Sequence, residues 1–456
     1  MKTFIHCLFV ALLCLTVVTT SAALPDKYQV LDIGALADSG HAYRIGMNSA
    51  GQVAGWDMSD TGFRHAYLRD PDGLSIDLGT LGGMISRACD VNDAGWVVGM
   101  STVAGNGYHA FVAQPGYGLT DLGTLGGTNS TAYTVNNMGL VAGSAQDYSG
   151  FLRAFVWTPA TGMIGLPIPS GCSNAVAWDV NDLGQAVGFG RVAAGLGWNH
   201  ALLWDNPSVV IDLGTLGGPS SDAYGINDAG MIVGRSHNGQ ANHAFLWTYQ
   251  TGMIDLGTLA GGVSEAYGVN NPGQVVGHSG GRAFAWEAET GMVNLNDRID
   301  PDSGWLLQEA DAVNDDGWIA CYAYHLDLPD GLAAHTVLLM PDTKIEVAID
   351  IKPGSDKNPI NLKSKGTTPV AILASEDFDP QSVDVSTVSL AGAPVAQHKG
   401  RYQASMLDAN GDGLADLLVH VVTNQIACDG TQAALTGLTY DSKAMEGKDT
   451  IMLVGD

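Results

Sequence analysis

The chain has 456 residues and is strongly acidic, since 47 Asp and Glu against 20 Lys and Arg give a formal net charge of −27. Binding a polyanion requires a basic patch, so this balance argues against nucleic acid and anionic membranes as partners. Glycine is abundant at 60 residues, while charged residues make up 15% and hydrophobic residues 46%. This composition predicts many short strands joined by glycine turns, with a large core divided among two or three domains.

The first residues have the three parts of a secretory signal peptide. Lys2 precedes an apolar run over residues 4–18, and small residues follow up to Ala23. A helix that spans a membrane needs roughly 20 residues, and this run is shorter. We therefore predict residues 1–23 as a signal peptide that is cleaved after Ala23. The remaining chain is expected to have no membrane span and to be secreted, either extracellular or periplasmic.

Four cysteines lie outside the predicted signal peptide, at Cys89, Cys172, Cys321 and Cys428. An even number in an oxidising compartment permits disulfides, but the wide spacings leave the pairing open. No Cys-x-x-Cys pair occurs, so we expect neither a zinc site nor thiol redox chemistry.

A repeat of about 44 residues organises most of the chain. An Asn followed three residues later by Gly recurs at Asn48, Asn92, Asn136, Asn181, Asn227, Asn270 and Asn314. Four strand-sized segments accompany each Asn, and one complete copy has them at residues 223–227, 230–234, 243–247 and 252–257. Four short strands per repeat of this length are typical of the blades of a β-propeller.

The two ends of the repeat array allow two assignments of the blades. Residues 28–34 match the fourth segment of the repeat, and residues 335–340 match the third. The first strand can join the last three strands and so close a ring without an open sheet edge. Alternatively, each blade begins with the fourth segment, which gives seven complete blades without this closure. We predict an all-β, seven-bladed β-propeller over residues 28–341 and favour the closed ring.

The first segment of each copy alternates small with large residues. A strand period of two predicts that Ala223 and Gly225 lie on one face and that Tyr224 and Ile226 lie on the other. The turn that follows begins with Asn227, whose side chain is expected to cap its own backbone.

The combined motifs resemble a known family. The heptapeptide Asp-Leu-Gly-Thr-Leu-Gly-Gly at residues 77–83 returns at residues 121–127 and 212–218, and alternates with His-Ala-Phe at residues 109–111 and 243–245. This pattern is similar to the extracellular HAF-repeat family over about residues 28–341. The resemblance implies secretion and a repeat array, and it implies no established catalytic activity.

Two polar residues of the repeat are interpreted as structural. Histidine occupies one repeat position, at His65, His109, His200, His243 and His335. Arg153 and Arg282 replace it in two copies, so we interpret this residue as a hydrogen-bond donor to backbone or to a neighbouring blade rather than a metal ligand. The Asp of the Asp-Leu-Gly segment recurs at Asp32, Asp77, Asp121, Asp212 and Asp255 and is interpreted as a turn residue.

The fourth copy departs most from the repeat. Trp178 and Asp179 replace the usual Tyr and Gly, and a longer insertion contains Trp198. Asp90 and Thr134 lie at the repeat position of Asp179. Aromatic faces beside acids suit sugar stacking and hydroxyl bonding, so Trp178, Asp179 and Trp198 form a candidate ligand site. The alternative is divergent packing with a variable surface loop. No acid–base pair or nucleophile motif is found, and an enzyme is not expected.

Residues 346–456 lie beyond the repeat and predict a small β-sandwich, because short alternating segments occur without helical periodicity. The start of this region, with Ile-Asp-Ile-Lys-Pro-Gly-Ser at residues 349–355, resembles a module at the ends of secreted bacterial proteins.

Within this module, oxygen-bearing side chains recur at Asp408, Asn410, Asp412 and Asp416, with Gly413 at the sixth place. This spacing can wrap one Ca²⁺ and resembles the loops of dockerins and thrombospondin type 3 repeats. Val419 stands where an EF-hand has Glu, so flanking helices are not expected. The alternative is a polar hairpin turn, but we predict calcium, with a stabilising role.

These features together predict a secreted, non-enzymatic binding, adhesion or structural protein with a calcium-stabilised C-terminal module. Its expected partner is an extracellular glycan or protein. The alternative is a polysaccharide-active enzyme with its site on the propeller face near the irregular fourth copy.

Overall fold

The computed structural model describes residues 24–34, 45–105, 107–192, 198–326, 334–342, 344–355, 357–375, 377–428, 430–440 and 443–454. The predicted signal peptide lies outside these residues. The chain divides into two compact units, residues 1–341 and 342–456. The described parts of both units consist of β-strands with three short 3-10 helices, as the all-β prediction requires.

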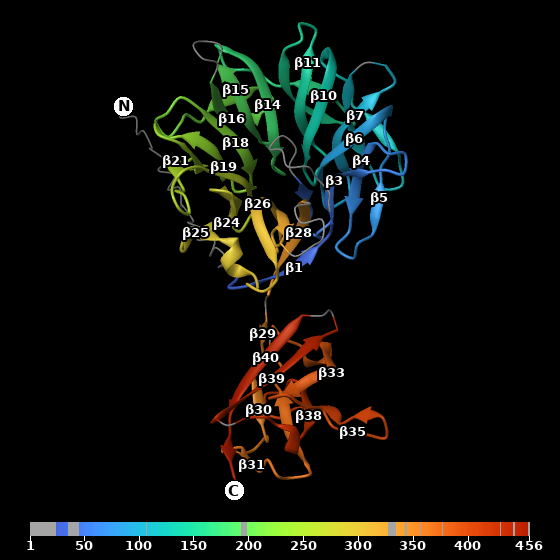
Figure 1. The fold of residues 1–456 in the computed structure, drawn as a ribbon, viewed down its shortest axis with the longest axis vertical. Coiled ribbons are helices and arrows are strands. Elements are labelled where there is room, and N and C mark those ends of the chain that lie inside the picture. Colours follow the sequence, from blue (N-terminus) through green and yellow to red (C-terminus); the bar gives the residue numbers. More distant parts are fainter. Residues whose placement is uncertain are drawn as a thin grey trace, which may run out of the picture. The chain divides into compact units, whose positions relative to one another are not determined.

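The first unit is built from four-stranded antiparallel sheets arranged around a common centre (Figure 1). One sheet contains β2 (Gly46–Met47), β3 (Val53–Met58), β4 (Arg64–Arg69) and β5 (Ser75–Asp77). The next contains β6 (Gly82–Val91), β7 (Val97–Val103), β8 (Tyr108–Ala113) and β9 (Leu119–Asp121). A third contains β10 (Gly126–Val135), β11 (Val141–Asp147), β12 (Leu152–Thr158) and β13 (Gly162–Gly165). A single parallel pair between Asn129 and Tyr108 joins these last two sheets.

Three further sheets continue round the centre in chain order. They contain β14 (Cys172–Val180), β15 (Ala186–Val192), β16 (Asn199–Asn206) and β17 (Val209–Asp212); then β18 (Ser221–Ile226), β19 (Ile232–His237), β20 (Asn242–Thr248) and β21 (Gly252–Asp255); then β22 (Ser264–Val269), β23 (Val275–Ser279), β24 (Arg282–Glu287) and β25 (Gly291–Asn294). The 3-10 helix η1 (Leu295–Arg298) follows β25.

The last sheet of this unit joins the two ends of the repeat array. Strands β26 (Trp305–Val313), β27 (Ile319–His325) and β28 (Ala334–Pro341) are completed by the N-terminal strand β1 (Tyr28–Asp32). β1 and β28 run antiparallel, with Tyr28 opposite Pro341 and Asp32 opposite Val337. β26 also contacts β2, so the sheets form a closed, β-propeller-like ring. This is the first of the two arrangements that the repeat offsets allowed.

The apolar core lies between successive sheets rather than within one of them. In one cluster, Ala66 and Leu68 of β4 pack with Val91 of β6 and Phe111 of β8. The phenylalanine of the His-Ala-Phe segment is fully buried in four sheets, at Phe111, Phe155, Phe245 and Phe284. Burying such a side chain contributes roughly 1.5–3 kcal/mol, so the repeated aromatic residue explains much of the cohesion between neighbouring sheets.

Buried serines in the innermost strands add polar links between sheets. Ala110 N in β8 donates to Ser130 Oγ in β10 at 2.8 Å, and Ser130 Oγ donates to Gly123 O at 2.5 Å. Ser86, Ser221 and Ser264 make the same pair of bonds in their copies. Each serine satisfies two backbone groups of the preceding sheet that would otherwise be buried without partners.

A β-bulge in the innermost strand corrects the predicted alternation of faces. Ala223 lies opposite Gly234, but the next paired residue is Gly225, opposite Val233. Because Tyr224 is the extra residue, Ala223 and Gly225 do not share a face as strict alternation predicted. Ala223 and Ile226 instead enter the same apolar cluster. A Cβ at Gly234 would lie 2.0 Å from Asp222 O, so glycine is required opposite the bulge.

No disulfide joins two cysteines within the described part of the chain. Cys89 and Cys321 are buried, whereas Cys172 and Cys428 are half-buried. Burial raises the pKa of the Cys89 thiol to about 12, so this side chain is a protonated core residue.

The second unit contains two larger sheets that share one apolar core, which includes Ile351, Val370, Val419 and Leu435. The first sheet has β29 (Ile345–Glu346), β40 (Ala444–Thr450), β39 (Gln432–Thr439), β33 (Val383–Leu390) and β34 (Ala393–Pro394). The second has β30 (Ile349–Ile351), β32 (Thr367–Ile372), β38 (Asp416–Val422) and β37 (Ala404–Leu407).

Smaller elements complete the second unit. They are the pair β31 (Pro359–Ile360) and β41 (Met452–Leu453), the pair β35 (Gln397–His398) and β36 (Arg401–Tyr402), and the 3-10 helices η2 (Pro380–Ser382) and η3 (Thr423–Gln425). None of the helices in the described ranges of either unit is long and apolar enough to span a membrane.

Candidate functional site: the polar centre of the ring

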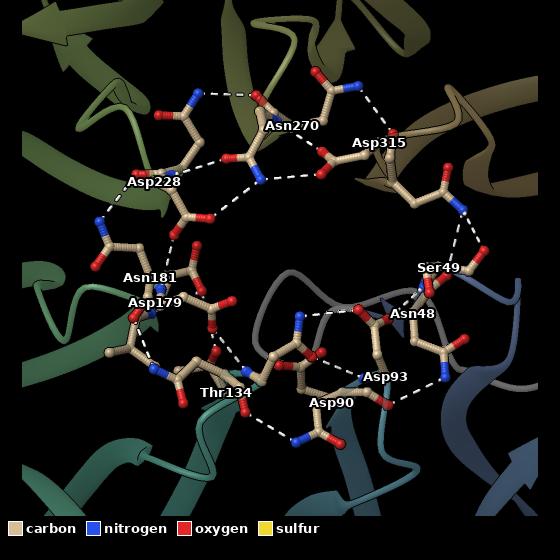
Figure 2. A pocket seen from close by; sticks show the side chains of 18 of the residues that line it. Asn48, Ser49, Asp90, Asp93, Thr134, Asp179, Asn181, Asp228, Asn270 and Asp315 are labelled. Carbon is tan, nitrogen blue, oxygen red and sulfur yellow. Dashed lines mark hydrogen bonds between the residues drawn. The ribbon is translucent and has the colours of Figure 1, made fainter.

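The asparagine that marks the repeat lines a polar cavity of about 250 Å³ at the centre of the ring (Figure 2). Asn92 Oδ1 accepts hydrogen bonds from Ala94 N at 3.1 Å and Trp96 N at 2.9 Å, which closes the turn as predicted. Asn92 Nδ2 donates to Asn136 O in the next sheet at 2.9 Å.

The same link from one sheet to the next runs all the way round the ring. Each repeat asparagine donates through Nδ2 to the main-chain oxygen of the next one. Asn314 completes the circle by donating to Asn48 O and Ser49 O, each at 3.3 Å. The repeated asparagine is therefore a structural residue that joins neighbouring sheets at the axis.

The residue after each asparagine forms a second polar circle. Asp93 N donates to Asn137 Oδ1 at 2.9 Å, and Asn137 N donates to Asp182 Oδ1 at 2.8 Å. Asn137 Nδ2 also donates to Asp93 Oδ2 at 2.9 Å. An amide beside a carboxylate offsets the repulsion between acids that lie close together at the axis. Ser49 occupies this position in the first copy and has no side-chain carbonyl to offer a neighbour.

Three residues break the symmetry of the cavity at the position that follows the β-bulge. Asp90, Thr134 and Asp179 stand where the copies at Gly46 and Gly225 have glycine, and Figure 2 shows them on one side of the ring. They come from consecutive sheets, on β6, β10 and β14.

The two carboxylates link neighbouring sheets. Asp90 Oδ1 accepts from Val91 N at 2.8 Å, and Asp90 Oδ2 accepts from Val135 N in the next sheet at 2.9 Å. Asp179 makes the same contacts with Val180 N at 2.8 Å and with Ile226 N at 2.9 Å.

Thr134 lies between the two acids, and the charge of Asp179 affects the protonation of Asp90. Its hydroxyl donates to Asp179 Oδ1 at 3.0 Å, and it also hydrogen-bonds with Asp90. Burial raises the pKa of Asp90 to about 7, and the charge of Asp179 adds to this effect. Hydrogen bonds from Val135 and Val91 oppose the rise without cancelling it. Near neutral pH, Asp90 is therefore close to half protonated.

The predicted ligand site at Trp178, Asp179 and Trp198 does not assemble as one site. Trp178 packs between Tyr133 and Tyr224 of the neighbouring sheets, with ring centroids 4.3 and 6.4 Å away. Asp179, which follows it, faces the axial cavity.

Trp198 lies elsewhere. Its side chain is 44% exposed, and its carbonyl accepts from Val192 N at 2.8 Å. Val192 pairs with Cys172, at the opposite end of β14 from Asp179, which is a separation of about 20 Å along the strand. Trp198 and Asp179 therefore do not contact a common small ligand.

The histidines of the repeat pair with the Asp of the same sheet, which corrects the predicted partner. His109 Nδ1 lies 2.8 Å from Asp121 Oδ2, so β8 is joined to β9 rather than to backbone or to a neighbouring blade. His65, His200 and His243 pair likewise, twelve residues before their partners. His335 pairs with Asp32 at 3.0 Å and so links β28 to β1 at the closure of the ring. The Asp also accepts from a glycine N–H two residues on, as a turn residue should.

In the second unit, the predicted calcium loop connects β37 to β38. Asp408 accepts from Gly411 N at 2.7 Å and from Gly413 N at 3.0 Å. Asn410 Nδ2 donates to Asp412 Oδ2 at 2.8 Å. Gly411 and Gly413 have φ of +82° and +89°, values that glycine adopts without strain.

Asp416 differs from the other three predicted ligands because it is fully buried. Its two oxygens accept from Ala374 N and Ala409 N, both at 2.8 Å. Over the described ranges, no group of three or more His, Cys, Asp or Glu side chains converges in a way that could hold a metal ion. The oxygens of Asp408, Asn410 and Asp412 match the hard ligands that Ca²⁺ prefers, whereas Asp416 anchors the loop to the end of β32.

Asp90 and Thr134 were not predicted as site residues, although the sequence held the signal. Both interrupt a repeat position that is glycine in three other copies, as Asp179 does. Their proximity could not be predicted, because it depends on the bulge that turns this position towards the axis.

Comparisons with known proteins give structural neighbours only. No family model and no curated protein matches the chain. A fungal alcohol oxidase of the AA5 family in complex with copper has 13% identity, covers 94% of this chain and 99% of its own, and has a TM-score of 0.45. Puromycin hydrolase has 14% identity, coverages of 79% and 63%, and a TM-score of 0.44. TolB from Acinetobacter baumannii has 12% identity, coverages of 68% and 79%, and a TM-score of 0.35. Similarity at this level supports no inference about activity.

Proposed function

We propose that this chain is a secreted, non-enzymatic protein that binds an extracellular glycan or protein through a seven-bladed β-propeller. The proposal rests on the hydrogen bonds that the repeated polar side chains make. The asparagines and the histidine–aspartate pairs hydrogen-bond within and between sheets. A ring held together in this way is a rigid support with a broad face, and it needs no catalytic group to be explained.

The asymmetric acids at the axis fit the same interpretation. Both oxygens of Asp90 and of Asp179 accept main-chain N–H groups from two sheets, which is a structural use of a carboxylate. The axial cavity of about 250 Å³ also falls below the roughly 300–1,000 Å³ that is typical of ligand pockets. We therefore expect the partner to bind on the outside of the ring rather than at its centre.

One observation favours the alternative, a polysaccharide-active enzyme. A carboxyl group with a pKa of about 7 beside a second carboxylate is the arrangement that a general acid requires. In this alternative Asp90 would donate the proton and Asp179 would stabilise the developing charge. The main-chain bonds to both carboxylates argue against it, because a catalytic oxygen must be available to the substrate.

We further propose that the second unit is a β-sandwich stabilised by Ca²⁺ at residues 408–416. Asp408, Asn410 and Asp412 would supply the ligands, and Asp416 would fix the loop between β32 and β38. The chemistry of these oxygens and the two positive-φ glycines support the proposal. The resemblance of the repeats to the HAF family and the predicted secretion are part of the same proposal.

The test is binding of the purified mature protein to an array of microbial and plant glycans, in Ca²⁺ and again with a chelator. Selective binding without product release supports the proposal, and loss of binding on chelation would assign a role to the C-terminal loop. Hydrolysis of a bound glycan that disappears in Asp179→Asn, with an unchanged Tm, would instead establish the enzymatic alternative. Asp60→Asn, the same change on an exposed turn, is the matched control.

A further inference from the structure

One repeat position in the third strand of each sheet carries a tryptophan in four copies, at Trp157, Trp204, Trp247 and Trp286. It lies four residues after the histidine or arginine of the His-Ala-Phe segment. In the β6–β9 sheet the corresponding residue is Ala113, at the end of β8. Arg69 and Leu339 hold this position in the remaining two sheets.

Trp204 shows what the indole does. It is 1% exposed, and it packs in one apolar cluster with Val156 and Leu166 of the preceding sheet. Its Nε1 donates to Pro167 O at 2.7 Å, just after that sheet's last strand. The ring therefore fills the space between two neighbouring sheets near their outer strands.

Where alanine replaces the tryptophan, this space is open. The cavity beside Ala113 has a volume of about 630 Å³, whereas the corresponding space beside Trp204 has about 230 Å³. Leu68 and Leu78 line the larger cavity from the same repeat positions that Val156 and Leu166 hold beside Trp204. The larger cavity thus corresponds to the space that the indole ring of Trp204 fills between its own pair of sheets.

The cavity has a buried apolar wall and an open mouth. Leu68, Val97 and Ala113 are at most 8% exposed, while Ile76 and Tyr117 are 45% and 77% exposed. A volume of this size, lined mainly by apolar side chains, lies within the usual range of small-molecule pockets.

Three of the polar side chains around the cavity already have partners. Gln52 Nε2 donates to Asp70 at 2.6 Å, and Asp77 pairs with His65 at 2.9 Å. Asp93 accepts from Ser49 N at 2.8 Å. Recognition in this cavity would therefore rest mainly on apolar contact and shape.

We propose that the cavity between the β2–β5 and β6–β9 sheets binds a small planar aromatic molecule of about the size of indole. This ligand class is chosen because the indole ring of a tryptophan occupies the equivalent space in four other sheets of the same protein. The site is a separate cavity that shares Asp93 with the lining of the axial cavity, and it does not depend on the glycan or protein partner proposed above.

The experiment is a ¹⁹F NMR titration of the full mature chain with 5-fluoroindole. A ligand of this size that binds by apolar contact is expected to have a Kd of about 1 mM or below. Ala113→Trp should weaken binding at least tenfold, because the introduced indole occupies the pocket. The proposal would be overturned if 5-fluoroindole did not bind the wild-type protein, or if it bound Ala113→Trp with equal affinity.

Two further variants keep the test decisive. Ala113→Leu narrows the same pocket with a smaller side chain and serves if Ala113→Trp does not fold; it too should weaken binding. Trp247→Ala opens the equivalent space between two other sheets and should add a second site, raising the stoichiometry from one to two. An unchanged stoichiometry in a folded Trp247→Ala protein would contradict the reasoning from equivalent positions.

Discussion

Asp90→Asn should be less stable than the wild-type protein at low pH and more stable than it at high pH. The pKa of this carboxyl rises from an ordinary value of 3.8 to about 7 in the folded protein. A raised pKa means that the folded state holds the proton more tightly than the unfolded state. The stabilisation from protonation is therefore complete below about pH 4 and is lost as the pH rises through about 7.

The size of the effect follows from this difference in pKa. About three pKa units correspond to about 4 kcal/mol of unfolding free energy lost between pH 4 and pH 8. Asn carries no charge, but its single carbonyl oxygen cannot accept from both Val91 N and Val135 N as Asp90 does, a loss of about 1–2 kcal/mol at every pH. Asp90→Asn should thus be less stable than wild type by about 1 kcal/mol at pH 4 and more stable by about 2–3 kcal/mol at pH 8.

The assay is urea unfolding of both proteins at several pH values, with the difference in unfolding free energy plotted against pH. Acids far from Asp90 titrate equally in the two proteins, so this difference reports Asp90 together with Asp179, whose charge is coupled to it. Ser149→Ala, on an exposed turn, is a control that should give a flat line. A difference for Asp90→Asn that does not change with pH would refute the raised pKa.

Further predictions concern the links between sheets and the loop in the second unit. Ser130→Ala should lower the unfolding free energy by about 2–3 kcal/mol, because Ala110 N and Gly123 O lose their partner, as chemical denaturation would show. Trp204→Ala should cost about 3–5 kcal/mol in the same assay through the cavity it leaves, and a cost below 1 kcal/mol would contradict the packing described. Added Ca²⁺ at a hundredfold excess over its Kd should stabilise the chain by about 2.7 kcal/mol in calorimetry, and Asp408→Ala should abolish the effect.

The repeat predicted the strands of the first unit well because each strand-sized segment was bounded by turn residues. The offset between residues 28–34 and 335–340 was enough to predict that β1 could complete the last sheet, as it does. The histidine of the His-Ala-Phe segment does form a hydrogen-bonded pair, but the predicted partner, backbone or a neighbouring blade, was wrong. Asp121 lies twelve residues beyond His109, and their contact depends on strand register, which a spacing alone does not reveal.

The centre of the ring was harder to predict. Asp179 was singled out as an irregularity and grouped with Trp198, which lies at the other end of the strand pair. Its actual neighbours, Asp90 and Thr134, come from sheets that are 45 or more residues away in the chain, and the bulge at each strand turns this position inwards. Local periodicity contains neither the closure of the ring nor the bulge, so it could not bring these residues together.

The most direct measurement is calorimetric titration of the mature protein with the glycan or protein that it selects from an array, followed by product analysis of the same sample. We predict saturable binding with the ligand recovered intact, and equal binding by Asp179→Asn if that variant is folded. Recovery of a cleaved ligand from wild type and an intact one from Asp179→Asn would contradict the account and assign the axial carboxylates to catalysis.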